Sequence, residues 1–221
     1  MSDLVDLVWE PLELPNIELY ETKLSEDIME YLWKRIEVSK EVNLDWRDRL
    51  AGQISCSLHL QDKDDYFMDR VLFPIAKHMI DGNRSAFGPQ FHQSFDEEKF
   101  QIRTDMTWWV NFQKQLEFNP QHIHSGILSF VIWMKIPTDW REQHELPFCQ
   151  GTGGPAASDF QFLYTDIIGN HQDYTITMDK TKEGTMVVFP AKLGHAVFPF
   201  YNCDEERISI AGNVLWNVVP K

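Results

Sequence analysis

The chain has 221 residues and a formal net charge of −14, with 43% apolar and 13% aromatic residues. This apolar content supports a packed core and excludes a wholly disordered chain. An acidic surface repels phosphate backbones and anionic lipids, so we expect neither nucleic acid nor a membrane as a partner. The longest apolar runs, such as 127–136, are too short to cross a bilayer.

The three cysteines, Cys56, Cys149 and Cys203, are far apart and form no CxxC pair. Together with the absence of a charged-then-apolar leader, they indicate free thiols in a reducing cytoplasm, which would be that of the host if the protein is viral. Sequence alone leaves the oligomeric state open, and a dimer is compatible with it.

The first hundred residues are expected to form a helical N-terminal layer. Residues 1–20 alternate apolar and acidic residues, which predicts an extended, solvated arm. Ser25 is a candidate N-cap for a first helix, whose apolar stripe consists of Ile28, Met29, Leu32, Trp33 and Ile36. A second stripe at helical spacing runs from Phe67 to Ile80, and Asp81-Gly82-Asn83 is expected to end it.

From residue 101 onward the pattern changes to short β-rich runs separated by glycine, proline and asparagine. The predicted strands are 106–113, 128–136, 160–164, 174–178, 185–189 and 207–219. Helices followed by many strands predict an α+β, mainly β protein with a sandwich or barrel in its second half. We interpret residues 1–221 as one domain, with the glycine-rich segment 143–158 as a mobile loop that acts as a lid.

Three of the eight histidines are candidate metal ligands. His122 and His124 are two residues apart on an extended segment, so their side chains point to the same face. An HxH pair alone is weak evidence, because surface histidines are commoner than metal sites. His195 strengthens it, because it follows a predicted strand and a turn and is expected at the end of the sheet. Three histidines meeting there would leave open coordination positions on one metal.

Arg207 begins an apolar strand in which Arg207, Ser209, Ala211 and Asn213 share one face. A buried guanidinium must meet an anion, and its fork matches a carboxylate. The alternative is a structural salt bridge to a carboxylate such as Asp204 or Glu205.

The order of these motifs resembles the Fe(II)/2-oxoglutarate oxygenase superfamily, which includes the prolyl hydroxylases. More narrowly, it is similar to 2OG-Fe(II) oxygenases of bacteria and marine phages. The motifs that carry the resemblance are Trp109-Val-Asn111, Asn119-Pro-Gln-His-Ile-His124, Leu128-Ser129, Lys135-Ile-Pro137, Phe189-Pro190, His195-Ala-Val-Phe-Pro199 and Glu206-Arg-Ile-Ser-Ile-Ala-Gly-Asn213. They cover residues 105–215.

The resemblance implies a double-stranded β-helix, or jelly roll, with His122, His124 and His195 as ligands of Fe(II). It implies that Arg207, Ser209 and Asn111 bind the cosubstrate 2-oxoglutarate. It also implies that O₂ is consumed, that succinate and CO₂ are released, and that ascorbate serves as a possible reductant. Two positions depart from the family. His124 stands where a carboxylate is usual, which leaves Asp166 as an alternative third ligand, and Trp133 stands where tyrosine is frequent.

Two other functions remain open at this point. A cupin-type dioxygenase would use the three histidines without 2-oxoglutarate, and a jelly-roll binding module would have no turnover. The substrate is expected to be a small molecule or a peptide or protein side chain, with a proline side chain as the first guess.

Overall fold

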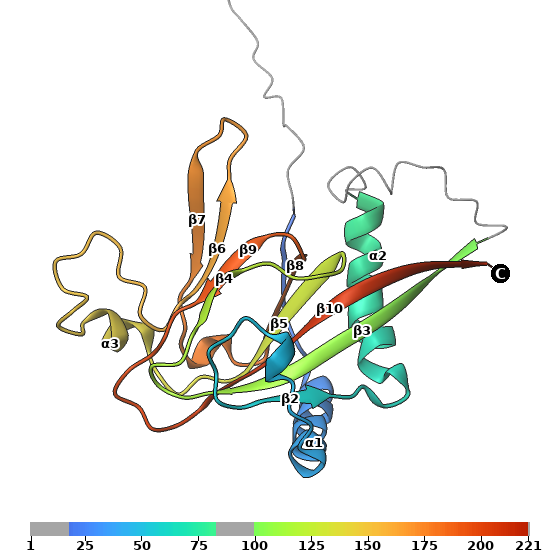
Figure 1. Ribbon diagram of the computed structural model, residues 1–221, viewed down its shortest axis with the longest axis horizontal. Coiled ribbons are helices and arrows are strands. Elements are labelled where there is room, and N and C mark those ends of the chain that lie inside the picture. The colour runs from blue at the N-terminus through green and yellow to red at the C-terminus, as the bar shows by residue number, and fades with distance from the viewer. Residues whose placement is uncertain (1–17, 83–99, 221) are drawn as a thin grey trace, which may run out of the picture.

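The computed structural model describes residues 18–82 and 100–220 (Figure 1). Most of the expected arm at 1–20 lies outside these residues. In chain order the helices and strands are β1 (Tyr20–Lys23), α1 (Glu26–Val42), β2 (Ser57–Leu60), α2 (Phe73–Gly82), β3 (Phe100–Gln113), β4 (Asn119–His122), β5 (Leu128–Lys135), α3 (Trp140–His144), β6 (Phe160–Thr165), β7 (His171–Ile176), β8 (Thr185–Pro190), β9 (Gly194–Val197) and β10 (Arg207–Pro220).

Helix α1 follows the predicted pattern. Ser25 is its N-cap residue, although the side chain makes no capping hydrogen bond and instead interacts with Asp27. Asp27 still lies in the first turn, where the helix dipole favours a negative charge. The helix ends at Asn43, whose left-handed backbone (φ 51°) lets its N–H bond the carbonyl of Ser39.

The second predicted helix is divided into two parts. A π-helical turn covers Met68–Leu72, and α2 starts at Phe73, whose N–H donates to the carbonyl of Met68. Pro74 explains the break, because proline has no N–H to continue the α-helical ladder at this point. The predicted apolar stripe is nevertheless buried at Phe67, Met68, Leu72, Ala76 and Met79.

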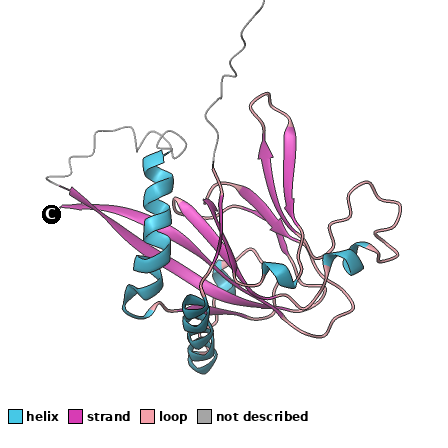
Figure 2. Ribbon diagram, turned by 180° about the vertical axis from the view of Figure 1, so that it is seen from behind, coloured by secondary structure: helices cyan, strands magenta, loops and turns pink. Residues whose placement is uncertain are grey.

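Two antiparallel sheets form the β half, as the jelly-roll expectation requires. The larger sheet has the strand order β1-β8-β5-β10-β3-β2, and the smaller has β4-β9-β6-β7. Strands β1 and β2 come from the first hundred residues, so this region is not only a helical layer. Figure 2 shows the helices α1 and α2 on the same side of the larger sheet.

Side-chain alternation along the larger sheet separates two cores. Phe130 and Ile132 of β5, with Ile210 of β10, pack in the cluster that contains α1 and α2. Val131 and Trp133, on the opposite face of β5, pack with Phe160, Phe162 and Phe189 between the two sheets. Because strand side chains alternate, the odd-numbered residues of β10, including Arg207, also face the space between the sheets.

Strands β5, β6, β8 and β10 begin and end within one residue of the prediction, whereas β3 begins at Phe100, six residues before the predicted start at 106. The predicted 174–178 is wrong by several residues, because the strand β7 begins at His171 and is exposed over its first four residues, so no alternation reveals it. Strands β1, β2, β4 and β9 have four residues each and were not predicted. Within the described ranges no helix is long and apolar enough to cross a membrane.

Candidate metal and cosubstrate site

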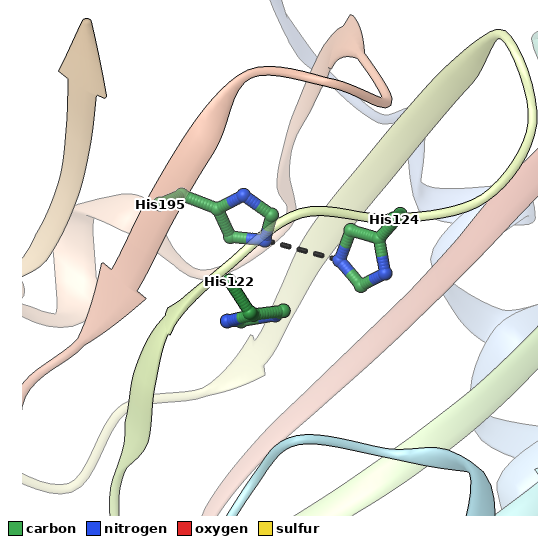
Figure 3. Close-up of side chains that lie close together, drawn as sticks. All are labelled: His122, His124 and His195. Atoms are coloured by element: carbon green, nitrogen blue, oxygen red, sulfur yellow. Dashed lines mark hydrogen bonds between the residues drawn. The ribbon is translucent and has the colours of Figure 1, made fainter.

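The three candidate histidines meet at one end of the smaller sheet (Figure 3). His122 ends β4 and His195 lies on β9, and the two residues are direct partners in the sheet. The turn after β8 leads directly into β9, so His195 lies within a separate short strand. His124 lies just beyond β4, where its N–H donates to the carbonyl of Ala191 at 2.8 Å.

The donor atoms of these histidines lie within 4.8 Å of one another, close enough to bind one ion. The Nε2 atoms of His124 and His195 are 3.0 Å apart. Two ligands at 90° on a metal with bonds of about 2.1 Å would be separated by about 3 Å, so this pair already has the spacing of adjacent ligands. The sequence prediction that the HxH side chains share a face is confirmed, with ring centroids 4.9 Å apart.

Backbone carbonyls orient two of the rings. The Nδ1 of His122 is 2.7 Å from the carbonyl of Pro120, and the Nδ1 of His195 is 3.0 Å from that of Leu193. With Nδ1–H as the donor in each case, Nε2 carries the lone pair that a metal ligand requires, and that of His195 faces the Nε2 of His124.

Burial keeps the rings neutral. Desolvation lowers the pKa of His122, and it lowers the pKa of His124 to about 3, assisted by repulsion from His195 and His122. Desolvation and the charge of His122 lower the pKa of His195 to about 4. At neutral pH all three imidazoles therefore have a lone pair available for a metal.

Arg207 lies in the same cavity as the histidines and is 2% exposed. Its Nη2 donates to the carbonyl and hydroxyl oxygens of Ser158, while its Nε and Nη1 have no hydrogen-bond partner among the described residues. Desolvation lowers its pKa to about 10, partly offset by the charge of the buried Asp159.

Among the described residues, the alternative of a structural salt bridge from Arg207 to Asp204 or Glu205 is wrong. Glu205 pairs with Lys135 at 2.7 Å, and Asp204 accepts a hydrogen bond from Gln115 at 2.9 Å. Two guanidinium nitrogens thus remain available for an external anion. The cavity is narrow, with a volume of about 40 Å³, and none of the described residues that line it is acidic.

The remaining predicted residues also line this cavity. Ser209 and Asn111 are direct partners on β10 and β3. The Oδ1 of Asn111 accepts from the hydroxyl of Ser57 at 2.7 Å, so the Asn111 amide nitrogen is the group left for a ligand. Trp133 lies beside Ser209 on β5 and forms part of the wall.

The alternative ligand Asp166 is not part of the cluster. It lies in the turn between β6 and β7, where its carboxylate accepts hydrogen bonds from Ile168, Asn170 and Gln172.

Sequence reasoning missed the role of Ser158. This residue comes from the predicted lid, whose two ends are anchored in the structure. Ser158 contacts Arg207, and the side chain of Gln143 makes two hydrogen bonds to the backbone of Tyr201. No motif marks Ser158, because a serine in a glycine-rich loop is ordinary.

Comparisons with known proteins bear on the family and the fold. Residues 107–213 match the family model described as "Putative 2OG-Fe(II) oxygenase", a span that contains every predicted site residue. No curated protein matches the sequence. A solved structure of a Pseudomonas putida prolyl-4-hydroxylase has a TM-score of 0.51 and 13% identity over 90% of this chain and 92% of that chain. A 2OG-Fe(II) oxygenase family oxidoreductase from Burkholderia pseudomallei gives a TM-score of 0.40 and 12% identity, with 88% and 85% covered. The first likeness supports the double-stranded β-helix fold.

Proposed function

We propose that this chain belongs to the 2OG-Fe(II) oxygenase family, whose model matches residues 107–213, and that it is a hydroxylase that couples oxidation of its substrate to conversion of 2-oxoglutarate into succinate and CO₂. In this proposal Fe(II) is bound by His122, His124 and His195, and 2-oxoglutarate by Arg207 with Ser209 and Asn111. The iron supplies the activation of O₂ that the protein's own side chains cannot perform.

One observation supports the cosubstrate most directly. Arg207 is a buried guanidinium with two nitrogens that no described residue hydrogen-bonds, and it shares a cavity with three neutral, closely spaced imidazoles. The charge of Asp159 compensates this buried guanidinium only in part, so the site favours an anion that reaches from the metal position to the guanidinium. A dicarboxylate that chelates the metal at one end satisfies both groups.

The protein's own residues have three tasks in this reaction. The carbonyls of Pro120 and Leu193 hold two imidazoles in the tautomer that binds metal. The guanidinium of Arg207 fixes the far carboxylate of the cosubstrate. Aromatic walls formed by Trp133, Phe160 and Phe189 exclude water from the metal position. Because the cavity is narrow, the cosubstrate has to displace wall side chains as it enters.

The absence of a carboxylate ligand has a chemical consequence. Three neutral histidines leave the site one unit more positive than two histidines and a carboxylate. No described residue that lines the cavity supplies a negative charge. The two carboxylates of 2-oxoglutarate would therefore provide the compensating charge. Iron binding should for this reason be tighter when 2-oxoglutarate is present.

Anaerobic titration of 2-oxoglutarate into the Fe(II)-loaded protein tests the proposal. We expect a charge-transfer absorbance from the chelate and, after air is admitted with ascorbate, formation of succinate. The second candidate is the cupin-type dioxygenase, which the histidine at position 124 favours. Bound iron without a chelate band at millimolar 2-oxoglutarate would select that candidate, and failure to bind any metal would favour a binding module.

We further propose that residues 1–221 act as a single domain in the cytoplasm. Strands β1 and β2, from the first hundred residues, support the single domain because they form the two edges of the larger sheet.

A further inference from the structure

A second, wider cleft opens beside the histidines. Its volume is about 380 Å³, within the range of small-molecule sites. His122, His124, Trp109, Asn111 and Asn119 line both this cleft and the narrow cavity that contains Arg207. The outer wall is the segment 46–52, which precedes β2. A molecule in this cleft would therefore reach the metal position from the side that the Arg207 cavity does not occupy.

Arg49 is held at the outer wall with its hydrogen-bond donors free. Its guanidinium stacks over the ring of Trp46 at 4.1 Å, and Trp46 packs in turn against His59, with centroids 4.5 Å apart. The guanidinium makes no hydrogen bond to any described residue, and its ion pair with Asp48 is long, at 3.9 Å. Stacking fixes the plane of a guanidinium and leaves its edge available to a planar anion.

The charge of the cleft contrasts with that of the chain. Although the net charge is −14, Arg49 is the only Lys, Arg, Asp or Glu among the described residues that line this cleft. Apolar side chains supply much of the remaining wall, including Leu50, Ile123 and Trp109. The cleft therefore combines an apolar surface with one positively charged group.

We propose that this cleft is the substrate site and that Arg49 binds a carboxylate of the substrate, which makes the substrate a carboxylate-bearing molecule with an apolar body. This inference rests on the proposed function. Such a carboxylate can belong to a free amino acid or to an acidic side chain within a peptide. In either case Arg49 is a specificity-determining residue, and the histidines and Arg207 keep their roles.

The experiment compares matched probes that differ only in charge. Standard free L-amino acids are paired with their amides, and short blocked peptides with a central glutamate are paired with the same peptides containing glutamine. Each probe is added to the Fe(II)- and 2-oxoglutarate-loaded enzyme, and stimulated succinate formation and oxygen insertion by mass spectrometry are measured. Binding of the same probes to the metal-free protein is measured by calorimetry.

We expect acids to bind and to stimulate turnover more strongly than their uncharged partners, and the responding panel identifies the source. Arg49→Gln should raise the apparent KM of the responding acid about tenfold or more, with kcat little changed, and should weaken calorimetric binding equally. Arg70→Gln is the matched control, because Arg70 also stacks on an aromatic ring, that of Tyr66 at 4.3 Å, but does not line the cleft.

Two results overturn the inference about Arg49. One is equal behaviour of acids and amides, or no response to either. The other is an acid response that Arg49→Gln leaves unchanged. Failure of the proposed function has a different signature, which is the absence of the 2-oxoglutarate chelate band in the wild type, and the calorimetry on metal-free protein then still tests Arg49.

Discussion

Replacing Arg207 should separate its function from its effect on stability. The guanidinium is 2% exposed and has two nitrogens without a hydrogen-bond partner in the part of the chain that the structure describes. Its pKa falls from 12.5 to about 10, which corresponds to on the order of 3 kcal/mol against the charged form. The contacts with Ser158 offset about 1–2 kcal/mol of this. Arg207→Met, which keeps the volume but removes the charge, should therefore leave the free energy of unfolding of the metal-free protein unchanged or raise it by about 1–2 kcal/mol.

The same change should weaken cosubstrate binding strongly. Loss of one partner of a desolvated charge pair weakens the binding free energy by roughly 2–5 kcal/mol. The Kd for 2-oxoglutarate should therefore rise about 30-fold or more in Arg207→Met or Arg207→Ala. Arg207→Lys should restore only part, because an ammonium cannot make the two-pronged contact. Iron content should remain near that of the wild type in all three variants.

Chemical denaturation of the metal-free variants and anaerobic titration of the iron-loaded variants measure the two effects. Arg35→Met is a suitable control, because Arg35 bonds the carbonyl of Gln61 and does not line the cavity. If Arg207→Met bound 2-oxoglutarate as well as the wild type, another basic residue would hold the cosubstrate. A loss of more than about 2 kcal/mol of stability would show that the charge of the buried Asp159 already compensates Arg207 in the free protein.

Further predictions concern the metal, the pH dependence, the loop and the sheet. His122→Ala or His195→Ala should remove stoichiometric iron while circular dichroism stays unchanged, and His124→Asp should retain or tighten the metal; full occupancy in both alanine variants would refute the assignment. His124 and His195 have folded-state pKa values of about 3 and about 4, below the unfolded value of about 6.5. The unfolded state therefore binds more protons than the folded state. The free energy of unfolding of the metal-free protein should fall by up to about 1.4 kcal/mol per pH unit per histidine as the pH drops from 6.5 to 4. A free energy of unfolding that stays constant over this pH range in denaturant titrations would contradict this. In the segment 150–154, which is exposed, amide hydrogen exchange should be fast and should slow when ligand binds, so strong protection in the free protein would show a structural role. Gly212→Ala should cost about 1–3 kcal/mol of stability, because a Cβ there would lie 2.6 Å from Phe130, and an unchanged melting curve would mean that the ring moves freely.

The sequence by itself determined much of the site. The same-face geometry of His122 and His124 follows from the two-residue period of an extended chain. The inward direction of Arg207 follows from alternation along β10, a strand long enough to have a readable pattern. The long strands β5, β8 and β10 were predicted within one residue at each end for the same reason.

Only the tertiary structure decided which groups meet. Pairing of β4 with β9 brings His195 to His122 from more than seventy residues away, and strands of four residues are too short to show a period. The structure also showed that Asp166 belongs to a turn, that Ser158 contacts Arg207, and that Arg49 lines the same cleft as His122 and His124. These contacts depend on loops folded across sheet ends, where local sequence sets the backbone but long-range packing selects the partner.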